Sequence, residues 1–237
     1  MTIDVEVPPP RTRAPRPQKS PKAATGGRKA AIDDDASSAA QILRAAASAF
    51  MVKGYAATSI DDVADVLGCT KGRIYYSFKS KTDLFFEVHR EAMQMIMTET
   101  GKAAENVADP IQRIAAMSRA HVLVIMKNIE FQCVVVQGLD MHMHGQITPQ
   151  QRKSLRELLA MRDRYEAMFV EAIEEAMRRE TLPNQDAHVV VKALLGALNW
   201  TTIWYRPRRG ETAAGRSATA DGVVGFCVRG LGAPYAA

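Results

Sequence analysis

The segment SIDDVADVLGCTKGRIYYSF, residues 59–78, constrains the fold more than any other part of the chain. Apolar side chains repeat at helical spacing over residues 60–67, and Gly68 then lets the chain turn sharply. Thr70 is one of the residue types that favour a helix N-terminus, so we expect a second short helix from Lys71 to Phe78. Two short helices joined by a three-residue turn form a helix-turn-helix.

Helical signals also dominate the rest of the chain. Ala and Met supply much of the apolar 47%, and aromatic residues make up only 6%, a balance that favours helices over strands. No stretch alternates between apolar and polar residues as a strand would. A first helix is expected to end at Gly54, and another to begin after Ser80. Further helices are expected over Pro110 to about Asn128, Phe131 to Met143, Pro149 to about Glu180 and Asp186 to Tyr205. After a loop at 211–217, the last helix is expected from Thr219 to Leu231.

Residues 1–35 differ in composition, with six prolines, a Gly-Gly pair and three consecutive aspartates. Such a polar, proline-rich segment predicts a disordered arm. Seven basic and two acidic groups fall within residues 1–29, so this segment accounts for the whole net charge of +5. The arm is either a solvated tail with no specific role or a basic extension that attracts phosphates regardless of sequence.

The segment from Cys69 to Thr82 stands out within the neutral remainder of the chain. It holds four basic residues and no acidic one. Local positive charge of this kind is typical of a surface that faces phosphates, and the second helix of a helix-turn-helix enters the major groove of DNA. A short solvated helix with stray lysines is the alternative interpretation.

Four linked motifs occur in the stretch ILRAAASAFMVKGYAATSIDDVADVLGCTKGRIYYSFKSKTDLF. They are F-x-x-x-G-Y, T-S-I-x-x-V-A, G-x-I-Y-x-S-F and K-x-x-L, one for each of four successive helices. With them, the chain from Ala39 to about Met97 resembles the DNA-binding domain of TetR/AcrR-type transcriptional regulators, although Ser77 stands where many relatives have His. The resemblance implies an all-α fold: a three-helix helix-turn-helix DNA-binding domain over residues 36–97, then a helical effector-binding and dimerisation domain over residues 98–237.

The resemblance also assigns DNA contacts residue by residue, within a helix-turn-helix motif that runs from Ser59 to Phe78. Thr58 and Ser59 are expected to bond a phosphate through hydroxyl and backbone N–H, and Arg73 is the best candidate for a bidentate contact to guanine. Lys79 and Lys81 are expected to contact the DNA backbone. The full expected set is Thr58, Ser59, Thr70, Lys71, Arg73, Tyr75, Tyr76, Lys79 and Lys81.

The segment LLGALNWTTIWYRPRRG, residues 194–210, resembles the penultimate helix of a TetR subgroup that includes repressors of steroid and fatty-acid catabolism. Those repressors respond to acyl-CoA thioesters. The methionines of this half suit either an adaptable lipophilic pocket or ordinary core filling, and its tryptophan pair suits either the effector or a dimer interface formed by the last two helices. The residues expected at the effector are Met97, Met117, His121, Met141, Tyr165, Trp200, Trp204 and Arg206.

Several classes of function are not predicted. The chain has no G-x-S-x-G, P-loop, dinucleotide fingerprint or H-E-x-x-H, so we expect neither an enzyme nor a cofactor. The spacing of His142 and His144 puts their imidazoles on different faces of a helix, so no metal site is expected. No apolar run approaches the roughly 18 residues of a membrane span, and three scattered cysteines favour a reducing cytoplasm over a disulfide framework.

Together these features predict a cytoplasmic, homodimeric transcriptional repressor that binds double-stranded operator DNA. A small lipophilic effector would release the repressor from its operator, and an acyl-CoA thioester is the candidate effector. The alternative is a helical acyl-CoA-binding protein or enzyme that does not bind an operator.

Overall fold

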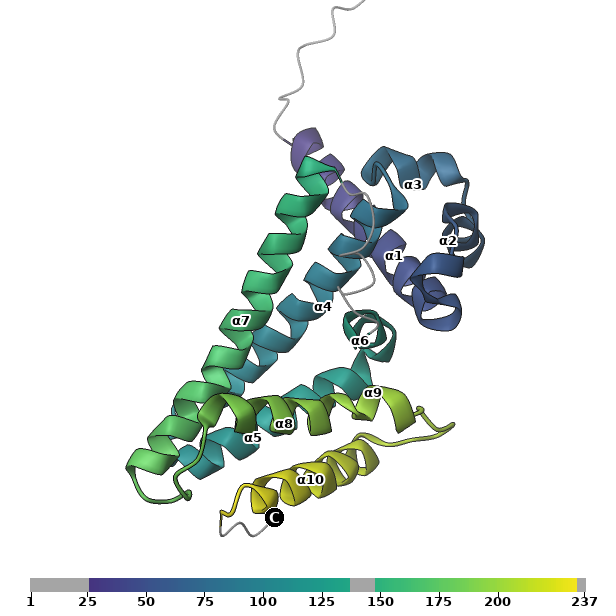
Figure 1. Ribbon diagram of the computed structural model, residues 1–237. Helices are drawn as coiled ribbons and strands as arrows, with labels where there is room; N and C mark the ends of the chain where they lie inside the picture. The colour runs from purple at the N-terminus through teal and green to yellow at the C-terminus, as the bar shows by residue number, and fades with distance from the viewer. Residues whose placement is uncertain (1–25, 137–147, 234–237) are drawn as a thin grey trace, which may run out of the picture. The chain divides into compact units, whose positions relative to one another are not determined.

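All elements of the described chain are helices, which confirms the all-α prediction (Figure 1). The computed structural model describes residues 26–136 and 148–233, with side chains from Ser38 onward. The helices are α1 (Gly26–Ala57), α2 (Ile60–Leu67), α3 (Lys71–Ser77), α4 (Lys81–Ala104), α5 (Pro110–Lys127), α6 (Ile129–Val136), α7 (Pro149–Arg178), α8 (Ala187–Asn199), α9 (Thr201–Trp204) and α10 (Ala213–Gly230).

The ends of these helices follow from local capping. At the start of α2, the Ser59 hydroxyl accepts the Asp62 N–H while the Asp62 carboxylate accepts the Ser59 N–H, which forms a capping box. Thr148 and Gln151 form the same arrangement at the start of α7. Gly68 ends α2 with a φ of 68°, a left-handed conformation that glycine adopts without strain.

The first helix begins earlier than expected and is interrupted at Gly54. It begins at Gly26, so residues 26–35 are helical where a disordered arm was expected, while residues 1–25 of that arm lie outside the described chain. At the other end, Gly54 interrupts the helix as expected, with a φ of 73° and a ψ of 161°, and beyond this kink the chain continues helical to Ala57.

The second helix of the helix-turn-helix is one residue shorter than expected, which corrects its end from Phe78 to Ser77. The Phe78 N–H still bonds the Ile74 carbonyl at 2.8 Å, but its own backbone is extended, with a φ of −131° and a ψ of 121°. This conformation turns the aromatic ring into the core, where it is only 8% exposed. Burial of the ring therefore ends α3, and the Phe78 side chain packs the end of the helix-turn-helix against the core.

Two expected bounds in the C-terminal half were also wrong. The helix expected over 186–205 breaks at Trp200, because the Ile203 N–H bonds the Trp200 carbonyl three residues back and tightens the turn. The last helix starts at Ala213 rather than after a loop, because the Thr212 hydroxyl accepts the Gly215 N–H and caps it. Of the segment expected over 131–143, residues 137–143 lie outside the described chain.

Helix α4 holds the core of residues 38–233 together. It packs against α5, α6 and α7, while α10 packs against α5 and α8 and α2 packs against α3 (Figure 1). Beside the helix-turn-helix, Phe50 and Phe85 meet edge to face with ring centroids 5.4 Å apart. The expected domain boundary at residues 97/98 falls inside α4, so the division into domains stays a prediction.

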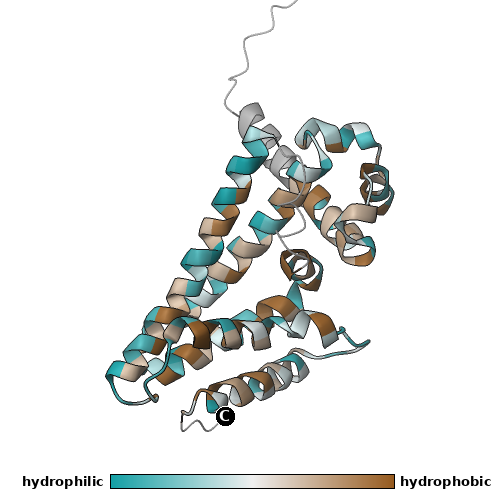
Figure 2. Ribbon diagram, viewed as in Figure 1, coloured by the Kyte–Doolittle hydropathy of each residue, from teal (hydrophilic) through white to brown (hydrophobic). Residues whose placement is uncertain are grey.

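Most helices contain both hydrophobic and hydrophilic residues, whereas the short helix α6 is mainly hydrophobic (Figure 2). Over residues 26–136 and 148–233, none of the helices combines the length and the hydropathy that crossing a membrane requires.

Candidate functional site

Helix α3 presents a continuous exposed face. Its one buried side chain is Ile74, which packs with Val63 of α2 in a core that fixes the two helices. Tyr76 is 81% exposed and Tyr75 is 49% exposed. Most of the side chains expected to contact DNA are exposed here: Thr70, Lys71, Arg73, Tyr75, Tyr76 and Lys79. Phe78, the last residue of the expected motif, is buried and does not belong to this face.

Arg73 is held in place by the first helix. Its guanidinium donates to the Ser38 hydroxyl at 3.1 and 3.3 Å and to the Gln41 side-chain oxygen at 3.1 Å. Both partners are neutral, so the positive charge of Arg73 is not cancelled by them. The contacts orient the guanidinium without removing its charge, and both partners must be exchanged if Arg73 is to reach a base.

Two other basic residues in this region are also engaged. Lys71 lies 3.4 Å from a carboxylate oxygen of Asp61, although both side chains are well exposed. Lys81 points inward and donates to the backbone carbonyls of Tyr55, Ala56 and Thr58 at 2.9, 3.3 and 2.8 Å. Lys81 therefore closes the end of α1 and, like Arg73, would have to exchange these bonds to contact DNA.

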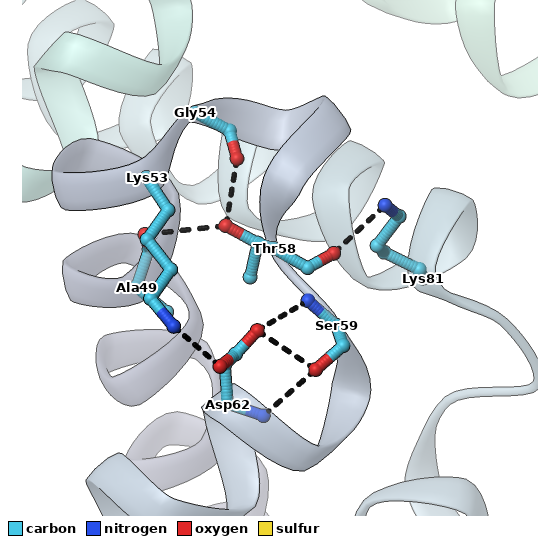
Figure 3. A network of polar contacts seen from close by, with 7 residues as sticks. All are labelled: Ala49, Lys53, Gly54, Thr58, Ser59, Asp62 and Lys81. Atoms are coloured by element: carbon cyan, nitrogen blue, oxygen red, sulfur yellow. Dashed lines mark hydrogen bonds and ion pairs between the residues drawn. The ribbon is translucent and has the colours of Figure 1, made fainter.

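The groups expected to contact a phosphate at the start of α2 have partners within the protein (Figure 3). The Thr58 side chain is buried, and its hydroxyl donates to the carbonyls of Gly54 and Ala49 at 2.7 and 3.3 Å. The hydroxyl and backbone N–H of Ser59 are both used by Asp62. The bond from Lys53, together with the capping bonds, holds the pKa of the Asp62 carboxyl well below its usual range. These groups are occupied in fixing the helix-turn-helix.

A second site is a cavity of about 280 Å³ among the later helices. His121 and Tyr165, both expected at the effector, line it. Its other walls come from α4, α6, α7 and α8 and, apart from Met93, were not singled out from the sequence. The lining residues are Met93, Ile96, His121, Gln132, Val135, Arg162, Tyr165, Glu166, Lys192, Leu195, Gly196 and Asn199.

A chain of hydrogen bonds crosses one wall of this cavity. Thr100 and Tyr165 meet at 3.1 Å, Tyr165 meets His121 Nδ1 at 2.6 Å, and His121 Nε2 meets Asn199 Oδ1 at 3.1 Å. Burial lowers the pKa of His121 to about 4 and raises the pKa of Tyr165. Both side chains are therefore neutral near pH 7, and every bond is satisfied when Thr100 donates to Tyr165, Tyr165 to His121 and His121 to Asn199.

Charged side chains of the cavity lie at its solvent-exposed edge. Lys192 of α8 pairs with Glu166 of α7 at 2.6 Å, and Arg162 is exposed nearby on the same α7 wall. An ion pair this exposed contributes little to stability. Its position matters more, because it joins two helices that frame the cavity.

The remaining residues expected at the effector are elsewhere. Met117 lines a separate hollow of about 450 Å³ between α5 and α7, Met97 packs half-buried against the core, and Met141 lies outside the described residues, as do His142 and His144. Arg206 borders a hollow beside the α9–α10 loop and donates to the carbonyls of Thr202 and Tyr205.

Trp200 and Trp204 belong to an open apolar groove of about 700 Å³ between α8 and α10. Phe226, 74% exposed, lies on its α10 side. Small residues such as Gly196 and Gly222 form its floor. Exposed aromatic side chains gathered around a groove are typical of a protein contact surface.

Asn199 had a sequence signal that was missed. It follows Lys192 by two helical turns, with Leu195 and Gly196 between them on the same face, and these are the α8 residues that line the cavity. The two tryptophans that follow Asn199 form a stronger sequence pattern than a single amide does.

Comparisons with known proteins match both halves of the chain. Residues 42–88 match the family described as bacterial regulatory proteins, tetR family, and residues 107–231 match the family described as tetracyclin repressor-like, C-terminal domain. The transcriptional repressor KstR2 of Mycobacterium tuberculosis is 25% identical over 176 residues, which cover 70% of this chain and 80% of KstR2.

Solved structures share the fold. The TetR family regulator PfmR from Thermus thermophilus is 29% identical, with a TM-score of 0.66 over 80% of this chain and 95% of PfmR. AibR, solved in complex with isovaleryl coenzyme A and operator DNA, is 24% identical, with a TM-score of 0.64 over 80% of this chain and 97% of AibR.

Proposed function

Since the chain belongs to the tetR family of bacterial regulatory proteins, we propose that it is a homodimeric repressor that a small lipophilic effector releases from its operator. Membership itself makes the chain a DNA-binding transcriptional regulator and not an enzyme. The alternative of a helical acyl-CoA-binding protein or enzyme without an operator is therefore wrong.

The observation that carries operator binding is the exposed face of α3. A recognition helix needs side chains that reach base edges, and Tyr76 and Tyr75 stand free for this beside Thr70, whose hydroxyl makes no capping bond. Arg73 is a base-reading candidate once it leaves Ser38 and Gln41. Lys79 is the candidate for a phosphate contact, and Thr58, Ser59 and Lys81 would have to leave their partners in the protein to make one.

The groove between α8 and α10 supports the dimer. A second copy related by a two-fold axis would bring the same helices together as a four-helix bundle and cover Trp200, Trp204 and Phe226. Dimerisation also serves DNA binding in the cytoplasm, because two recognition helices about 34 Å apart meet successive turns of the major groove.

The cavity supports a small acyl thioester as the effector. AibR, with the same fold, was solved with isovaleryl coenzyme A. A cavity of about 280 Å³ suits a short acyl group and leaves the nucleotide outside. The exposed Arg162 and Lys192 at its edge are closer candidates for the coenzyme phosphates than Arg206, which is bonded to backbone carbonyls.

Release follows from linkage. An effector that binds better to a conformation with differently spaced recognition helices shifts the population away from the operator-bound state. A tenfold loss of operator affinity requires only about 1.4 kcal/mol of coupling.

The test is calorimetry with a panel of acyl-CoA thioesters and the matching free acids, with and without operator DNA. We expect a thioester to bind more tightly than its acid and more weakly to the DNA-bound protein. Equal affinity for free and DNA-bound protein would rule that thioester out as the inducer, and tighter binding by the free acids would rule out the whole class.

A further inference from the structure

We infer that Asn199 determines effector specificity by donating a hydrogen bond from its side-chain amide to the carbonyl oxygen of an acyl thioester. This inference rests on the proposed function, in which the cavity of about 280 Å³ holds the acyl group. It adds which atom of the effector is recognised, and by which residue.

The first step is the direction of the hydrogen bonds. The Asn199 Oδ1 atom faces His121 Nε2 at 3.1 Å and accepts its proton. Because an amide oxygen can only accept, neutral His121 carries its proton on Nε2, and its Nδ1 atom accepts from the Tyr165 hydroxyl at 2.6 Å. Tyr165 in turn accepts from Thr100 at 3.1 Å, so the buried chain has every proton placed when the oxygen of Asn199 faces His121.

The second step concerns the other atom of that amide. Over residues 38–136 and 148–233, no group accepts a hydrogen bond from Asn199 Nδ2. Asn199 lines the cavity and is only partly exposed. A ligand that fills the cavity displaces water from this oriented N–H donor, so an acceptor on the ligand is favoured over a group that leaves the donor unpaired.

The charge of the side chains that line the cavity favours a neutral ligand group beside Asn199. The buried polar side chains of the cavity, His121, Tyr165 and Gln132, are neutral types or held neutral. Its cations, Arg162 and Lys192, are exposed at the edge. A carboxylate beside Asn199 would lose its water without gaining a cation, whereas a thioester carbonyl has no charge to desolvate.

The fourth step is the position of Asn199 in the chain. It is the last residue of α8, directly before the break at Trp200, and Trp200 is 61% exposed at the groove between α8 and α10. A ligand that bonds Asn199 therefore acts where α8 ends, at the edge of the surface proposed for dimer contact. Through this surface, the hydrogen bond to Asn199 can change the spacing of the two recognition helices in the dimer.

The experiment compares two probes that differ only at the carbonyl. Isovaleryl coenzyme A carries the oxygen, and its thioether analogue, isopentyl-S-coenzyme A, has a methylene group instead. In the wild-type protein we expect calorimetry to give about tenfold tighter binding for the thioester, the ratio that corresponds to about 1.4 kcal/mol. Equal binding of the two probes, or no binding of either, would overturn the inference.

Variants identify the donor. Asn199→Asp keeps the shape and an acceptor for His121 but removes the donor, so the thioester-to-thioether ratio should fall to near one. Asn184→Asp, on the exposed turn after α7, is the matched control and should keep the wild-type ratio. Retention of the full ratio in Asn199→Asp would overturn the assignment. Operator binding by the unliganded proteins is measured in parallel, so failure of this inference is distinguishable from failure of the proposed function.

Discussion

The side-chain amide of Gln151 donates to the hydroxyl of Ser80 at 3.2 Å, and this bond joins the N-termini of two long helices. Ser80 caps α4 directly after the recognition helix, and the same amide also reaches the Asp83 carboxylate at 3.2 Å. Gln151 belongs to the capping box of α7, the helix that carries Tyr165 to the cavity. A shift of α7 therefore has a direct contact through which to move the start of α4.

Replacing Gln151 tests this connection. We expect Gln151→Ala to bind the operator but to respond less to effector, with the ratio of operator affinities without and with effector reduced several-fold, because part of the coupling passes through this bond. Gln150→Ala, at the neighbouring exposed position, is the control. Fluorescence anisotropy of labelled operator measures the ratio, and an unchanged ratio in Gln151→Ala would show that the contact carries no coupling.

Two neighbouring lysines should separate stability from DNA binding. Lys81→Met removes the donor to three backbone carbonyls and should lower the free energy of unfolding by about 1–3 kcal/mol. Lys79→Met should leave stability unchanged and reduce the salt dependence of DNA binding by about one phosphate contact. Urea unfolding and salt titrations measure the two effects, and a reversal of the roles would contradict the geometry.

Stability should depend on pH through His121. Its pKa is lowered from 6.5 to about 4 in the folded protein, so between these values the unfolded chain binds a proton that the folded one does not. The free energy of unfolding should therefore fall as the pH drops from about 6.5 to about 4, by on the order of 3 kcal/mol. Comparison of His121→Gln with His188→Gln, an exposed control, isolates the effect. If the free energy of unfolding of His121→Gln depends on pH as steeply as that of the wild-type protein, the dependence does not come from His121.

A charge in the apolar groove should disrupt the dimer. Phe226→Glu places a carboxylate at the centre of the proposed contact, so sedimentation should show a monomer, and operator affinity should fall because the two half-sites are no longer bound together. Val52→Glu alters a side chain that is equally exposed but lies on α1, and it should stay dimeric. If the Phe226→Glu variant stays dimeric, the dimer interface does not lie at the groove between α8 and α10.

The sequence predicted what is decided locally. The capping box of Ser59 and Asp62 and the turn at Gly68 involve near neighbours, so the start and the turn of the helix-turn-helix were predictable. Its end was placed one residue late, at Phe78, because the burial of that ring depends on the surrounding core. The inward direction of Lys81 was not predicted, because its carbonyl partners lie more than twenty residues earlier and nothing in a lysine's own neighbourhood indicates whether it points inward.

The cavity shows the same limit. His121 and Tyr165 were predictable because a polar side chain on an apolar helical face must find a partner. The choice of Asn199 as the next partner depends on how α8 packs against α5, which no local pattern encodes. For the tryptophans both interpretations were open, and only their exposure favours the dimer surface.

Selection of binding sites from random duplex DNA tests operator recognition by the exposed face of α3. We predict that the purified protein enriches an inverted repeat with half-site centres about 34 Å apart, and that Tyr76→Ala, which changes an exposed residue of α3, loses this enrichment while remaining folded. Failure of the wild-type protein to enrich any sequence, or an unchanged motif with Tyr76→Ala, would contradict operator recognition by the exposed face of α3.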